Sequence, residues 1–66
     1  MTQAELNNLT YEELVDVCYA QERKFCEWRG QDSGLTKKMM VDINFPKETL
    51  IDCYLKTQKT MTGGRV

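Results

Sequence analysis

The sequence KKMMVDINFP (residues 37–46) decides between two folds for this chain. Apolar residues at positions 39, 41, 43 and 45 alternate with polar residues at 38, 42 and 44, and Met40 is the one exception. A period of two is typical of a β-strand with one buried face. The pattern therefore predicts a strand from about Lys37 to Phe45. Pro46 then favours an extended residue before it and a helix after it.

The segment before this stretch predicts a long helix from Tyr11 to Arg29. Thr10 and Glu13 have the spacing of a capping box, and Gly30 is a natural stop. On a helical wheel the apolar residues cover an arc of about 200°. A helix that packs against a single neighbour needs an apolar arc of only about 100°. We expect this helix to face two neighbours, one of which a second subunit could supply.

The segment after the stretch predicts a second helix, which Gly63-Gly64 ends, and a flexible tail over residues 62–66. The expected fold is one small α+β domain over residues 1–66, ordered helix–strand–helix. A single strand is not stable alone, so we expect it to pair with its copy across a homodimer. The alternative is an all-α helical hairpin that dimerises into a bundle.

The size of the chain also favours association. A chain of 66 residues buries only about 60% of the surface that its unfolded form exposes. Domains this small usually need additional stabilisation by disulfides, a bound metal or a partner subunit. Three cysteines and no histidine argue against a disulfide framework and a metal site, and we expect no cofactor. Association into a homodimer or higher oligomer therefore remains as the expected source of additional stability. The start of the sequence does not resemble a signal peptide, so we expect a cytoplasmic protein with reduced thiols, and no apolar run is long enough to span a membrane.

Residues 39–64 resemble the strand and first helix of the ribbon-helix-helix family. The resemblance lies in the alternating strand, an aromatic residue directly before Pro46 and the amphipathic segment that follows; the family's second helix has no counterpart here. It implies two antiparallel strands in a DNA major groove. Carried over by position, the outward residues are Lys38, Met40, Asp42 and Asn44.

The first helix carries the leading candidate site, formed by Tyr19, Glu22 and Trp28. Tyrosine and tryptophan are enriched at binding hot spots, and a carboxylate inside an apolar arc is costly unless it is paired. Glu22 could instead form a salt bridge with Arg29, which lies at nearly the same angle on the helical wheel. Our leading hypothesis is a protein-binding module that modulates or inhibits a macromolecular partner through this apolar and aromatic face.

Two further functions remain open. The first is a dimeric DNA-binding regulator, in which Lys38, Met40 and Asn44 face bases while Lys37 and Lys47 face phosphates. The second is an oligomer that holds a small anionic ligand, because residues from 31 onward hold six basic and four acidic side chains. No residues are assigned to catalysis, since histidine and a phosphate-binding loop are both missing, and we expect no enzyme.

Overall fold

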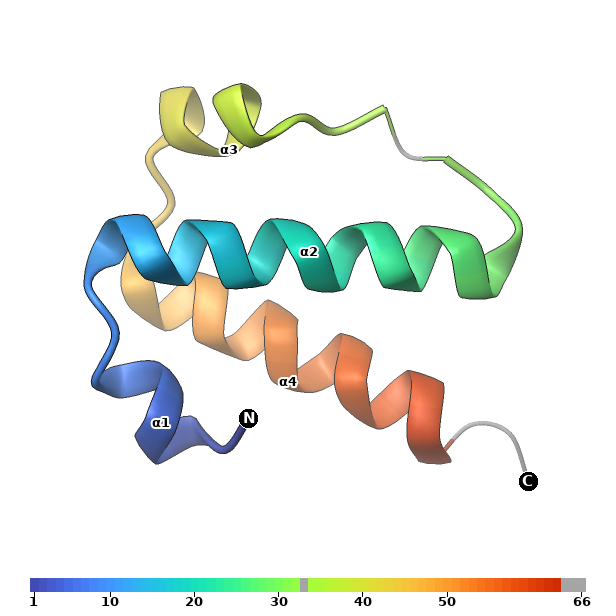
Figure 1. The fold of residues 1–66 in the computed structure, drawn as a ribbon, viewed down its shortest axis with the longest axis horizontal. Helices are drawn as coiled ribbons and strands as arrows, with labels where there is room; N and C mark the ends of the chain where they lie inside the picture. Colours follow the sequence, from blue (N-terminus) through green and yellow to red (C-terminus); the bar gives the residue numbers. More distant parts are fainter. Residues whose placement is uncertain (33, 64–66) are drawn as a thin grey trace.

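The computed structural model describes residues 1–32 and 34–63, and over these residues every regular element is a helix. The four helices are α1 (Gln3–Asn7), α2 (Tyr11–Arg29), α3 (Lys37–Ile43) and α4 (Lys47–Gly63) (Figure 1).

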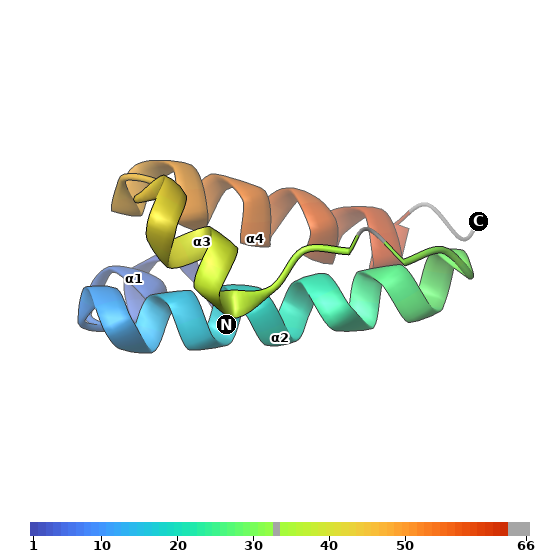
Figure 2. The ribbon, with the colours of Figure 1, turned by 90° about the horizontal axis from the view of Figure 1, so that it is seen from above.

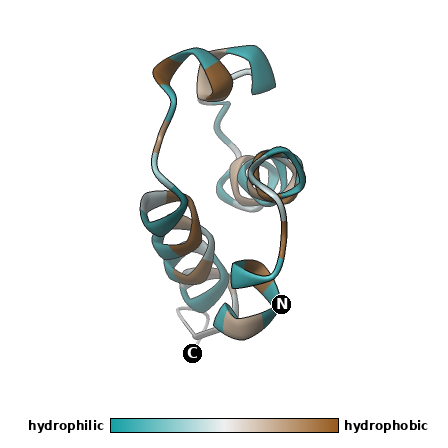
Figure 3. Ribbon diagram, turned by 90° about the vertical axis from the view of Figure 1, so that its left-hand side faces the viewer, coloured by the Kyte–Doolittle hydropathy of each residue, from teal (hydrophilic) through white to brown (hydrophobic). Residues whose placement is uncertain are grey.

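Helices α2 and α4 form the main packed pair, and they run side by side in the same direction (Figures 1 and 2). Between the end of α2 and the start of α4 the chain crosses back over the pair, and α3 is part of this return path (Figures 1 and 2). Helix α1 packs against α4 at the opposite side from α3 (Figure 3). This order places three helices, α2, α3 and α4, around one space.

The predicted bounds of α2 are confirmed. Thr10 Oγ1 accepts a hydrogen bond from the Glu13 amide at 3.2 Å, and Glu13 Oε1 accepts one from the Thr10 amide at 3.0 Å. At the other end Gly30 adopts φ 75°, the left-handed conformation that favours glycine. Local capping signals therefore suffice to define this helix.

The strand predicted over residues 37–45 is wrong, because Lys37–Ile43 forms α3. Thr36 Oγ1 caps the helix by accepting from the Met39 amide at 3.2 Å, and Asn44 closes it at φ 58°. Met40, the exception to the alternation, is the buried residue of α3, at 5% exposure. Met39, Val41 and Ile43, three of the apolar residues that suggested a strand, are exposed on this short helix, and Phe45 follows its end.

Three further expectations depended on the predicted strand. The α+β class is wrong, the ribbon-helix-helix resemblance is not supported, and the described residues contain no strand that could pair across a homodimer. The all-α alternative fits the four helices. Its helices are not a simple antiparallel hairpin, since α2 and α4 point the same way (Figure 1).

Helix α4 begins directly after Pro46, whose carbonyl accepts from the amides of Thr49 and Leu50 at 3.0 and 3.2 Å. It extends through Gly63, two residues into the segment for which we expected a flexible tail. Residues 64–66 lie outside the described part. In the described ranges no helix has both the length and the apolar character needed to cross a membrane.

The core lies where α1, α2, α3 and α4 converge. Its buried side chains are Leu6, Leu14, Val15, Cys18, Met40, Leu50 and Ile51. The start of α4 is tied to the α1–α2 turn by Lys47 Nζ, which donates to the carbonyls of Asn7 and Leu9 at 3.3 and 2.8 Å. Tyr11 Oη donates to the Phe45 carbonyl and joins the start of α2 to the α3–α4 turn.

Candidate functional site

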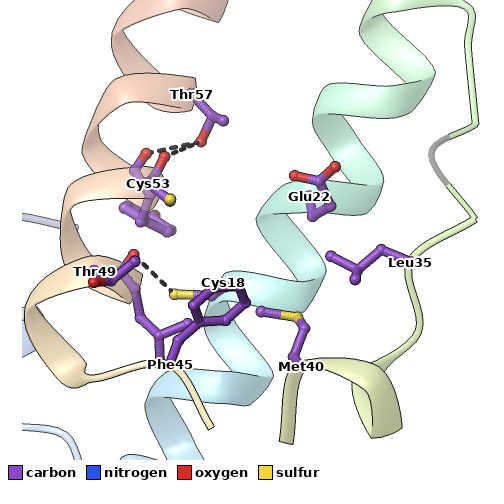
Figure 4. Close-up of a pocket in the computed structure, with 10 residues that line it drawn as sticks. Cys18, Glu22, Leu35, Met40, Phe45, Thr49, Cys53 and Thr57 are labelled. Atoms are coloured by element: carbon purple, nitrogen blue, oxygen red, sulfur yellow. Dashed lines mark hydrogen bonds between the residues drawn. The ribbon is translucent and has the colours of Figure 1, made fainter. Parts of the chain in front are cut away.

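A largely apolar pocket of about 160 Å³ lies between α2, α3 and α4 (Figure 4). Its lining residues are Cys18, Glu22, Leu35, Met40, Phe45, Thr49, Leu50, Cys53, Tyr54 and Thr57. Helix α4 supplies half of them, α2 supplies two, and the rest come from α3 and its flanks. The pocket therefore exists only when all three helices are assembled.

Cys18 and Met40 lie close together in the pocket (Figure 4), and both are buried, as is Leu50, which also lines it. Cys18 Sγ donates to the Leu50 carbonyl at 3.3 Å. Burial, with a smaller contribution from nearby Cys53, raises the pKa of Cys18 to about 11. Cys18 is therefore a neutral thiol near pH 7 and part of an apolar floor, not a nucleophile.

Among the described residues that line the pocket, Glu22 is the only acidic one and none is lysine or arginine. Its carboxylate is half-buried and accepts a long hydrogen bond from Cys26 Sγ at 3.6 Å. The considered salt bridge to Arg29 is not among the ion pairs of the described residues; the Arg29 guanidinium instead donates to Gln31 and lies 5.2 Å from the centroid of the Phe25 ring. The ion pairs of the described chain involve other residues.

Two of the polar groups that line the pocket, the Thr57 hydroxyl and the Glu22 carboxylate, present acceptor oxygens. Thr57 Oγ1 donates its proton to the carbonyls of Cys53 and Tyr54 at 3.0 and 2.9 Å, which leaves its lone pairs available. The Glu22 carboxylate adds two acceptor oxygens (Figure 4). The anionic ligand considered from the sequence would find no cation among the residues that line this space.

The predicted partner-binding residues do not form one surface. Tyr19 packs against the core, Glu22 lines the pocket, and Trp28 is 45% exposed. Trp28 stacks on Phe25 with ring centroids 5.8 Å apart. Nine residues at about 100° each place Tyr19 and Trp28 on opposite sides of α2.

The structure also separates the five residues of the DNA-binding alternative. Met40 is in the core, Asn44 caps α3, and Lys38 is exposed. Lys37 forms an ion pair with Asp16, and Lys47 binds two backbone carbonyls. Met40 cannot reach a base from the core, so strand-based readout has no structural basis here.

Sequence reasoning missed an exposed apolar surface on α3. Met39, Val41 and Ile43 are 45%, 49% and 54% exposed, and we call them the α3 patch. At about 100° per residue, Met39 and Ile43 lie on one side of a Lys38–Asp42 stripe and Val41 lies on the other. A helical wheel of residues 37–43 would have revealed this arrangement had the strand not been preferred.

Comparison with known proteins adds no family. No protein-family model, curated protein or solved structure matches this chain. Within the described ranges no cluster of three histidine, cysteine, aspartate or glutamate side chains is placed to hold a metal ion.

Proposed function

We propose that this chain is a small protein-binding module that docks through α3. The observation that carries the proposal is the α3 patch, which concentrates three large exposed apolar side chains on a seven-residue helix. Single exposed apolar residues are normal on a protein surface, but three large ones on one short helix, on both sides of a Lys38–Asp42 stripe, favour an interaction site. The module would act by covering an apolar surface of its partner.

The charges of α3 favour a second copy of the chain as the partner. Lys38 and Asp42 are exposed, lie four residues apart and take no part in the ion pairs of the described chain. If two α3 helices meet antiparallel about a two-fold axis, Lys38 of each copy lies against Asp42 of the other. The α3 patch then packs on both sides of these two ion pairs.

Interface size sets the expected strength. Stable complexes bury about 1,200–2,000 Å² in total, and two helices of seven residues supply less than this. We therefore expect a weak, reversible dimer. None of the cysteines Cys18, Cys26 and Cys53 is in a disulfide, which suits a reducing compartment and supports the cytoplasmic location expected from the sequence.

Light scattering over a range of protein concentrations tests the proposal. Wild type should rise from monomer to dimer mass, whereas the triple variant Met39→Gln, Val41→Thr, Ile43→Gln should stay monomeric with unchanged helix content. Trp28→Gln removes an equally exposed apolar side chain elsewhere, so it should associate like wild type.

Charge reversal tests the two-fold geometry. Lys38→Asp should abolish the dimer because it opposes like charges, and adding Asp42→Lys should restore it. A wild type that stays monomeric at millimolar concentration contradicts the proposal. Equal association of wild type and the triple variant would place the interface elsewhere.

A further inference from the structure

The pocket between α2, α3 and α4 has a size and chemistry that the proposed docking through α3 does not use. We propose that it binds a small ammonium ion carrying a single ring, with the ring on the apolar floor and the ammonium group at Glu22. This inference is independent of the α3 patch, none of whose residues lines the pocket.

The volume limits the ligand to one ring. A pocket of about 160 Å³ is close to the roughly 150 Å³ of an apolar protein cavity that accepts benzene. Met40, Phe45 and Leu50 provide carbon and sulfur contacts but no strong hydrogen-bonding side chain. Water is poorly held by such a lining, so an apolar ring gains from replacing it.

The charge of the ligand follows from Glu22. Glu22 is a half-buried residue at the pocket, and among the described residues its carboxylate accepts only a long hydrogen bond from the Cys26 thiol. A carboxylate taken partly out of water is stabilised by a charged donor. The Thr57 oxygen, whose own proton is already donated to backbone carbonyls, adds a second acceptor.

Aromatic side chains strengthen this preference. Phe45 and Tyr54 both line the pocket, and the faces of such rings attract a nearby cation. An anion would meet the Glu22 charge, and none of the described residues that line the space is basic. The arrangement therefore discriminates by charge as well as by size.

Three probes of similar shape separate these contributions: benzylammonium, benzyl alcohol and benzoate. Titrations followed by amide chemical shifts should show benzylammonium binding with a Kd on the order of a millimolar, as expected for so few atoms. The shifts should centre on the pocket residues of α2 and α4. Benzyl alcohol should bind more weakly, and benzoate should not bind.

Glu22→Gln should weaken benzylammonium about tenfold, the effect of one lost charge-assisted contact, and leave benzyl alcohol unchanged. Glu27→Gln is the matched control, because it removes the same charge from an exposed position of the same helix. It should bind like wild type. Cys53→Leu adds carbon atoms at the pocket wall and should prevent binding of both probes.

Several results would overturn the inference. These are equal binding of benzoate, equal effects of Glu22→Gln and Glu27→Gln, full binding by Cys53→Leu, or no shifts in the pocket. Circular dichroism of each variant verifies that it folds. The α3 triple variant should bind benzylammonium normally, so failure here and failure of α3 docking remain distinguishable.

Discussion

Cys18 illustrates how one buried side chain links packing to pH. Its thiol is 6% exposed, and its hydrogen bond to the Leu50 carbonyl joins α2 to α4. The thiolate would lose both water and this donated hydrogen bond, so the folded state favours the protonated form. The packing of the α2–α4 pair therefore depends on a neutral thiol.

This dependence predicts a loss of stability at alkaline pH. An unfolded cysteine ionises near pH 9.0, whereas folded Cys18 has a pKa of about 11. Between these values the unfolded state releases a proton that the folded state keeps. The stabilisation is therefore fully present below pH 9 and falls as pH rises towards 11.

Urea unfolding of wild type and Cys18→Ala at several pH values between 8 and about 10.5 measures this effect. Cys18→Ala should have a lower free energy of unfolding at every pH. Its free energy of unfolding should fall less steeply than that of wild type as the pH rises, because the variant has no thiol at position 18 to ionise. Parallel declines in the two proteins would show that Cys18 is not responsible.

Glu22 is the residue for which sequence reasoning came nearest to the site. Its position within an apolar arc marked it as unusual, and the structure places it at the pocket. The pocket itself could not be predicted, because its other walls come from α3, α4 and their flanks. Their relative positions depend on a chain path that no local pattern specifies.

At the level of elements, α2 was predictable because its ends carry local signals that tertiary packing does not override. Thr10 and Glu13 fix the start, and Gly30 fixes the end. Helix α3 was missed because seven residues give too few turns to separate helical from alternating periodicity. Useful signals were nevertheless present: Thr36 can cap a helix and Asn44 tolerates a positive φ.

The two interpretations of residues 37–45 predict opposite effects for neighbouring methionines. In the helix Met40 is buried and Met39 is 45% exposed, whereas a strand would bury Met39. Met40→Ala should therefore reduce the free energy of unfolding by about 2–5 kcal/mol, enough to unfold a chain of this size. Met39→Ala should change it by about 0.5 kcal/mol or less.

Chemical denaturation followed by circular dichroism measures both changes at low protein concentration, where α3 pairing does not contribute. If Met40→Ala is too unstable to study, Met40→Leu keeps the volume and should remain folded. A larger loss for Met39→Ala than for Met40→Ala would contradict the helical assignment.

At the scale of the whole molecule, the chain forms a thin slab with extents of 33, 27 and 14 Å. A slab encloses less volume for its surface than a sphere, and only seven apolar side chains form the buried cluster. Stability of such a domain is expected to be marginal on its own. Association through α3 would reduce the exposed surface without enlarging the chain.

This geometry predicts that thermal stability depends on protein concentration. Because a dimer that binds only folded chains stabilises them by mass action, the melting temperature should rise by several degrees between about 10 μM and 1 mM. Calorimetry or circular dichroism at the two concentrations measures the change. The melting temperature of Lys38→Asp should be the same at both protein concentrations. A melting temperature of wild type that does not change with concentration would count against dimerisation.

The common direction of α2 and α4 has an electrical consequence. Each helix carries a dipole along its axis, and dipoles that point the same way add, whereas those of an antiparallel hairpin nearly cancel. The amide-rich starts of both helices lie together at one edge of the molecule (Figure 1). The backbone is thus a polarised body, and copies that lie side by side lower their electrostatic energy when their dipoles point in opposite directions.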